Sequence, residues 1–258
     1  MTARSFLVRG LLAGLIAGAF AFVVGYTVGE PPIDDAIALE ATAAPAAAPD
    51  PTAGHTHDHA GTAHSHGDDA GGGISRTTQK TWGLATATIA VGVALGGIVA
   101  LVAAGVAGRL GRLSLVGSTA LVTALGFVAY SLLPFLKYPA APPAVGSANT
   151  IGSRTASYFA FVLISVVAMV AVVALAGALA PRLGGHQAVV AAGTAYVAVV
   201  AVAALAMPTV NEIGAFPADV LWEFRLSALL TQTALWAALG VALTWLLGRL
   251  ESRSRATA

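Results

Sequence analysis

The 258-residue sequence contains no cysteine, which excludes disulfide bonds and thiolate-bound metal. Charged residues are also scarce. Asp, Glu, Lys and Arg make up 10% of the chain, whereas a soluble domain has about 25%. A chain that is 57% hydrophobic and has so few charges cannot cover a water-facing surface. The composition therefore predicts an integral membrane protein.

Several catalytic motifs are absent as well. The sequence has no Gly-x-x-x-x-Gly-Lys-Ser/Thr loop for ATP, no His-Glu-x-x-His pair and no Gly-x-Ser-x-Gly elbow. The apolar runs also lack the His-x-x-x-His and His-x-x-x-Asp pairs that several metal carriers use inside the membrane. We therefore predict that the protein is not an enzyme, and that it does not drive transport with a P-loop ATPase of its own.

Six apolar runs are long enough to cross a bilayer as helices of about 20 residues. They cover residues 6–28, 84–107, 114–133, 157–180, 187–207 and 226–248. The fold class predicted from them is an all-α membrane protein, a bundle of about six transmembrane helices with a disordered, His-rich extracytoplasmic loop. The predicted organisation is a first span at 1–29, an extracytoplasmic loop at 30–83, a five-span bundle at 84–250 and a cytoplasmic tail at 251–258.

The first run permits two interpretations. Arg4 and Arg9 before an apolar stretch are typical of a secretory signal peptide, but the stretch exceeds 20 residues and no small-residue cleavage site closes it. We therefore favour a retained span. Proline ends or kinks helices, so Pro31 and Pro32 predict the end of this span, and Pro134 predicts the end of the third.

Glycines recur at four-residue spacing in the first two runs. Gly10, Gly14 and Gly18 share one helix face, as do Gly92 and Gly96. Small residues on one face allow a neighbouring helix backbone to approach closely. These glycines therefore predict helix packing and not a ligand site.

The basic residues predict the orientation, because cytoplasmic loops are enriched in Lys and Arg. With a cytoplasmic N-terminus, the inner segments contain eight basic residues: Arg4, Arg9, Arg109, Arg112, Arg182, Arg249, Arg253 and Arg255. The longer outer segments contain five: Arg76, Lys80, Lys137, Arg154 and Arg225. Both termini are then cytoplasmic. Eleven of the twelve acids lie outside, where they would concentrate divalent cations.

Five of the six histidines fall within residues 55–66, inside a stretch of small and polar residues. Neutral imidazole and carboxylate are metal ligands, so this stretch predicts a mobile metal-binding tether. The predicted ligands are His55, His57, His59, His64, His66, Asp58, Asp68 and Asp69. Without thiolate or clustered methionine they disfavour copper(I) and leave cobalt, nickel and zinc open. No tightly bound cofactor is expected. The alternative is a polar or pH-sensitive spacer.

Polar residues near the outer ends of the spans form a second candidate set. The members are Glu30, Asp34, Lys137, Tyr138, Asn149, Arg154, Asn211, Glu212, Asp219, Glu223 and Arg225. Together they would line an outer vestibule that receives a cation from the tether. The alternative, favoured for each residue alone, is a belt of ion pairs at the membrane interface.

Several motifs are similar to those of the CbtA family of predicted cobalt transporter subunits. They are Arg9-Gly10-Leu11-Leu12-Ala13-Gly14, Gly29-Glu30-Pro31, Pro134-Phe135-Leu136-Lys137-Tyr138-Pro139, Pro142-Pro143-Ala144-Val145-Gly146, Thr150-Ile151-Gly152 with Arg154-Thr155, Pro208 with Val210-Asn211-Glu212, and Phe216-Pro217-Ala218-Asp219 with Leu221-Trp222 and Phe224-Arg225. The resemblance extends along nearly the whole chain. It implies cobalt uptake for cobalamin synthesis in the cytoplasmic membrane of a bacterium. It also implies a small single-span partner with a histidine-rich end, CbtB.

The function predicted from these features is divalent metal transport, with cobalt the expected ion and the tether as the capture device. The first alternative is a membrane-anchored accessory or sensor protein that captures metal and transports nothing. The second is a membrane scaffold with an incidental histidine tract. The expected contacts are membrane lipid and the CbtB-like partner. A homo-oligomer is left open, and no nucleic acid is expected.

Overall fold

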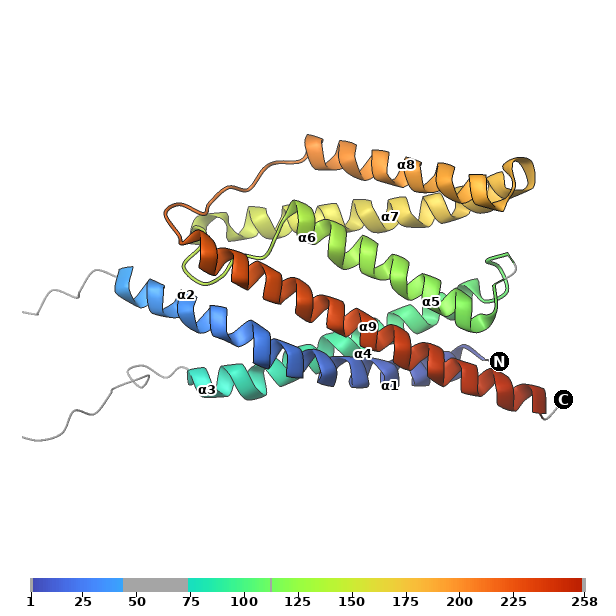
Figure 1. Cartoon of the computed structure of the whole chain (residues 1–258), viewed down its shortest axis with the longest axis horizontal. Coiled ribbons are helices and arrows are strands. Elements are labelled where there is room, and N and C mark those ends of the chain that lie inside the picture. Colours follow the sequence, from blue (N-terminus) through green and yellow to red (C-terminus); the bar gives the residue numbers. More distant parts are fainter. Residues whose placement is uncertain (1, 44–73, 112, 257–258) are drawn as a thin grey trace, which may run out of the picture.

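The computed structural model describes residues 2–43, 74–111 and 113–256, and the regular structure within them is entirely helical (Figure 1). Six helical segments are long and apolar enough to cross a membrane. They are Ala3–Thr42, Arg76–Val106, Leu115–Lys137, Ala148–Leu183, Gly185–Ala206 and Ala218–Ser252. This confirms the predicted all-α bundle of six spans. The predicted metal-binding tether lies outside the described residues.

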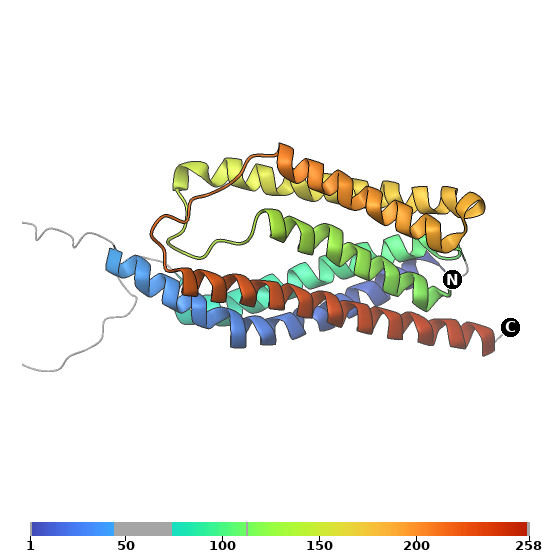
Figure 2. The same cartoon turned by 45° about the horizontal axis from the view of Figure 1, so that its top comes forward.

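Consecutive spans run in opposite directions, so the bundle has two distinct ends (Figures 1 and 2). The first and last described residues lie at one end, together with the turns at 107–111 and Gly184; we call this the terminal end. The opposite end, the loop end, contains residues 43 and 74 and the loops at 138–150 and 207–217. The candidate vestibule residues therefore lie at the loop end. The predicted tether falls in sequence between residues 43 and 74, which both lie at that end.

The first span continues through the two prolines that were predicted to end it. Helix α1 (Ala3–Val24) passes into a π-helical segment, η1 (Gly25–Gly29), and then into α2 (Glu30–Ala43). The backbone N–H of Glu30 donates to the carbonyl of Gly25, a π-helical contact. Pro31 and Pro32 follow in the next turn, after the wider π turn has displaced the carbonyls that proline would otherwise meet. The predicted end at Pro31 is therefore wrong.

The third span shows the same departure. Helix α5 (Leu115–Gly126) leads through η3 (Phe127–Leu132), a second π-helical segment, into α6 (Leu133–Lys137). Pro134 occupies the first turn of α6, and the helix ends at Lys137. The prediction that Pro134 ends this span is wrong for the same reason as at Pro31.

The second span begins earlier than its apolar run predicts. It consists of α3 (Arg76–Thr78), η2 (Gln79–Gly83) and α4 (Leu84–Val106). The hydroxyl of Ser75 accepts a hydrogen bond from the backbone N–H of Thr78, which caps the helix. The helical part therefore includes polar residues that extend beyond the apolar run.

The remaining spans are α7 (Ile151–Leu183), α8 (Gly185–Ala206) and α9 (Ala218–Ala256). A short 3₁₀ turn, η4 (Ala148–Thr150), precedes α7. Gly184 alone separates α7 from α8, and its φ of 80° is a backbone conformation that favours glycine.

The first packing cluster joins α1, α4 and α9, and its α1–α4 contact is backbone against backbone. A Cβ added at Gly14 would lie 2.8 Å from the Cα of Val93, and one added at Gly96 would lie 2.7 Å from the Cα of Gly14. The predicted packing role of the glycines is confirmed. Helix α9 contributes the fully buried Leu239, Leu243 and Leu247 to the same cluster.

The second cluster joins α7 and α8 to η3 and includes the buried Phe161 and Met169. Ser165 of α7 and Tyr196 of α8 form a buried hydrogen bond of 2.9 Å. The α5–η3–α6 span lies between the two clusters, and Trp236 of α9 donates a 2.8 Å hydrogen bond to the hydroxyl of Ser131 in η3. The outward faces of α7 and α8 are apolar, as lipid contact requires.

Candidate functional site

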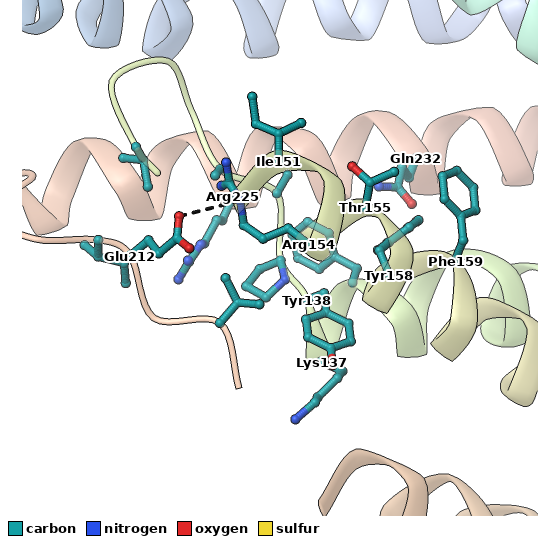
Figure 3. A pocket seen from close by; sticks show the side chains of 17 residues that line it. Lys137, Tyr138, Ile151, Arg154, Thr155, Tyr158, Phe159, Glu212, Arg225 and Gln232 are labelled. Atoms are coloured by element: carbon teal, nitrogen blue, oxygen red, sulfur yellow. Dashed lines mark ion pairs between the residues drawn. The ribbon is translucent and has the colours of Figure 1, made fainter. Parts of the chain in front are cut away.

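A pocket of about 410 Å³ opens at the loop end, between the loop at 138–150 and the loop at 207–217 (Figure 3). Helices α6, α7 and α9 provide the rest of its wall. Its polar lining consists of Lys137, Tyr138, Arg154, Thr155, Tyr158, Glu212, Arg225 and Gln232. Residues from two distant parts of the sequence, 135–159 and 210–232, therefore form one concave surface.

The loop at 138–150 is fixed by its backbone and by contacts with the second loop. Gly146 has a φ of 99°, and a Cβ there would lie 2.7 Å from the guanidinium carbon of Arg154. The hydroxyl of Tyr138 donates a 2.8 Å hydrogen bond to the carbonyl of Pro208. The amino group of Lys137 donates at 3.3 Å to the carbonyl of Met207. These bonds join the end of α6 to the start of the second loop.

Glu212 joins the two loops from the other side. One of its carboxylate oxygens accepts hydrogen bonds from the backbone N–H of Ser147 at 3.0 Å and the hydroxyl of Thr150 at 2.8 Å. The same oxygen lies 3.6 Å from Nε of Arg154. The Ser147 N–H, then the Thr150 hydroxyl and the charge of Arg154 lower the pKa of Glu212. The carboxylate therefore stays ionised through the neutral range.

We expect Glu212→Ala to free the first loop without unfolding the bundle, because the contacts it removes lie between loops. Backbone amide exchange across residues 145–155 should then become faster, with the largest change at Ser147. Because the pKa of Glu212 is lowered, these contacts are fully present above the ordinary glutamate pKa of about 4.3. They weaken as the pH falls through the pKa that Glu212 has in the folded protein. Hydrogen exchange measured by mass spectrometry at neutral pH checks the first statement.

The matched control is Glu223→Ala, an exposed acid of α9 that does not line the pocket. It should leave the exchange of residues 145–155 unchanged. Equal exchange in wild type and Glu212→Ala would contradict the proposed connection between the loops.

Arg225 differs from the other charged residues of the pocket because its side chain has no hydrogen-bond or ion-pair partner among the described residues. Its Nε is buried and unpaired. Figure 3 shows Arg225, Arg154 and Glu212 together at one side of the pocket, whereas Lys137 points away from them. Three basic side chains and one acidic side chain line the pocket, so its formal charge is +2.

The predicted vestibule residues divide into three groups. Five line the pocket: Lys137, Tyr138, Arg154, Glu212 and Arg225. Glu30 and Asp34 belong to a separate cluster. Asn149, Asn211, Asp219 and Glu223 line neither. Seven of the eleven residues thus lie in two separate places at the loop end, and the vestibule stays a prediction.

The separate cluster connects α2 to the start of the second span. Glu30 is buried, with 6% of its surface exposed, and is paired with Nη2 of Arg76. Nε of Arg76 also donates to Asp34 at 2.9 Å, and the amino group of Lys80 lies 3.5 Å from Asp34. These pairs hold together the two helices between which residues 44–73 are inserted.

Sequence reasoning missed three polar residues of the pocket: Thr155, Tyr158 and Gln232. Each stands near or within an apolar run, where it attracts little notice. Spacing provides the signal that would have found two of them, Tyr158 and Gln232. Tyr158 follows Arg154 by four residues and Gln232 follows Arg225 by seven, so each pair shares a helix face.

Among the described residues, no group of three or more His, Asp or Glu side chains is placed to hold a metal ion. His186, the one histidine that is described, is exposed at the turn between α7 and α8. The predicted ligands His55, His57, His59, His64, His66, Asp58, Asp68 and Asp69 lie outside the described residues.

A family model described as "Probable cobalt transporter subunit (CbtA)" matches residues 3–248. No curated protein and no solved structure matches the chain.

Proposed function

The chain belongs to the CbtA family of probable cobalt transporter subunits, and on that premise we propose that it takes part in cobalt uptake across the cytoplasmic membrane of a bacterium, for cobalamin synthesis. The observation that carries the proposal is the family match over nearly the whole chain. Six candidate membrane helices support it, because they make the chain a multi-pass membrane protein.

The distribution of basic residues supports a cytoplasmic terminal end. Seven described residues there are basic: Arg4, Arg9, Arg109, Arg182, Arg249, Arg253 and Arg255. The turns at that end are short, which is where the positive-inside rule applies best. The loop end then faces outward, and residues 44–73 with their five histidines are outside the membrane.

In the proposed mechanism the outer His-rich segment captures the ion. Its imidazoles bind divalent cobalt, nickel or zinc when neutral, above a pH of about 6.5. An interior-negative potential favours inward movement of a divalent ion by roughly 4.6 kcal/mol per 100 mV, twice the value for a single charge. The direction of transport thus has a physical driving force that requires no ATP.

A second membrane protein is part of the proposal. Within the described bundle the buried polar side chains are hydroxyls, apart from Glu30, which Arg76 already neutralises. Hydroxyls alone replace the water shell of a divalent cation poorly, so we propose that a small CbtB-like subunit supplies ligands for passage. The word "subunit" in the family description supports such an assembly.

The same observation favours one alternative of a different class. A membrane-anchored accessory protein that captures cobalt and delivers it to another transporter needs no ligands within its own bundle. Transport assays with and without the partner distinguish the two functions.

The deciding experiment measures cobalt, nickel and zinc accumulation in metal-starved cells that express the chain alone, the partner alone or both. We expect cobalt accumulation in cells with both proteins. Replacing residues 54–69 by a Gly/Ser segment of equal length should lower uptake at limiting cobalt by about tenfold, since local enrichment of the ion is lost, and should have little effect at saturating cobalt.

Absence of uptake in every strain, with the protein present in the membrane, would overturn the transport proposal. Uptake by the partner alone, increased by this chain only at limiting cobalt, would instead establish the accessory role. The Gly/Ser segment keeps the length between α2 and α3, so a loss of uptake reports on the histidines and aspartates.

A further inference from the structure

The charge of the pocket is opposite to that of the rest of the described loop end. The described part of the loop end has seven acidic residues: Glu30, Asp34, Asp35, Glu40, Glu212, Asp219 and Glu223. It has five basic residues: Arg76, Lys80, Lys137, Arg154 and Arg225. Two of the basic residues pair with acids of α2, whereas the other three line the pocket with a single acid. The pocket is therefore basic, whereas the rest of the described loop end has more acidic than basic residues.

That single acid is already engaged. Its bonded oxygen accepts from Ser147 and Thr150 and faces Arg154. Arg225 obtains no partner from it, and buried Nε–H groups are normally hydrogen-bonded. Gln232 lies seven residues after Arg225, on the same face of α9, and lines the same pocket. Its side chain also has no partner among the described residues. The pocket thus has hydrogen-bond donors, on Arg225 and Gln232, for which its own residues provide no acceptor.

We propose that this pocket binds an oxyanion, the carboxylate or phosphate group of a small molecule. A guanidinium presents a planar pair of N–H donors that matches such a group. The volume of about 410 Å³ lies within the range of small-molecule sites, and Phe135, Phe159 and Ile213 provide apolar walls for the rest of the ligand. Arg225 is the main contact, and Arg154 and Gln232 are positioned to assist.

A bare divalent cation is a poor ligand for this pocket. It would meet a formal charge of +2 and a carboxylate whose bonded oxygen is occupied. An oxyanion gains from the same charges. Anion binding here does not require cobalt transport, so the two functions can be tested separately.

Two kinds of molecule could present such an oxyanion at the loop end: a phospholipid, through its headgroup, and a soluble anion. The full-length protein is purified in neutral detergent and freed of metal. Citrate and inorganic phosphate are the soluble probes, measured by isothermal titration. Phosphatidylglycerol against phosphatidylcholine is the lipid probe, measured by native mass spectrometry.

We expect at least one probe to bind wild type, and Arg225→Gln to weaken that binding by about tenfold or more, as loss of a charge-assisted contact predicts. Arg225→Lys should retain part of the affinity, because the charge remains. The control is Arg182→Gln, an exposed arginine at the terminal end, which should bind as wild type does. Thermal unfolding of each variant shows that it is folded.

Arg225-dependent binding of citrate or phosphate identifies a soluble ligand. Arg225-dependent retention of phosphatidylglycerol identifies a lipid. If no probe binds wild type, or if folded Arg225→Gln binds the probes as wild type does, the proposal is overturned.

Discussion

Gly14→Ala is expected to lower the free energy of unfolding by about 3 kcal/mol, at the upper end of typical overpacking effects. The new methyl group would lie 2.8 Å from the Cα of Val93 and also collide with the carbonyl oxygen of Gly92. Both obstacles are backbone atoms of α4, so no side chain can rotate to make room. The two helices must separate, and the packing of neighbouring Gly10 and Gly18 is weakened with them.

Reversible unfolding in mixed micelles, followed by tryptophan fluorescence, measures this change. The matched control is Gly193→Ala in α8, where nothing lies within 4 Å of the added Cβ. Alanine is the better helix former, so the control should be neutral or more stable by up to about 1 kcal/mol. Equal stability of the two variants would show that α1 and α4 do not pack through their glycines.

Arg76→Gln is expected to produce the second largest effect, a destabilisation of about 2 kcal/mol. The change leaves the buried carboxylate of Glu30 without its partner, and breaking a fully buried pair in this way costs about 3–5 kcal/mol. The smaller figure applies because 21% of the Arg76 side chain is exposed to solvent. The α2 helix should then detach from the start of the second span.

A double-mutant cycle with Glu30→Gln isolates the pair. If the two groups act on each other, the double variant should be more stable than the sum of the single changes predicts. Lys80→Gln is the control, since its contact with Asp34 is exposed and should contribute at most about 1 kcal/mol. Additive effects in the cycle would mean that the Arg76–Glu30 contact contributes nothing to stability.

The membrane spans and the glycine contact were predictable because both depend on patterns that are local in the sequence. A run of twenty apolar residues has few alternatives to a helix, and glycines four apart must share a face. The helix ends at Pro31 and Pro134 were mispredicted because each proline follows a π-helical turn. Such a turn depends on packing and has no clear sequence signature.

The pocket could be predicted only in part. Sequence order placed its loops at the same end of the bundle, but Thr150 and Glu212 meet across 62 positions and Lys137 and Met207 across 70. Which polar groups meet over such separations depends on how the helices tilt. The acids that dominate the outer segments in number therefore suggested a cation vestibule, whereas three of the four charged side chains that line the pocket are basic.

The order of the helices in the first packing cluster sets a condition on how the protein is made. Ribosomes release α1 and α4 early, and their glycine faces can meet as soon as both have entered the bilayer. The leucines that complete the same cluster, Leu239, Leu243 and Leu247, belong to α9 and are synthesised last. Until then the α1–α4 pair exposes to lipid, or to a membrane chaperone, the face that α9 later covers. Nascent chains halted before α9 therefore lack a finished core, although five of their six spans are present.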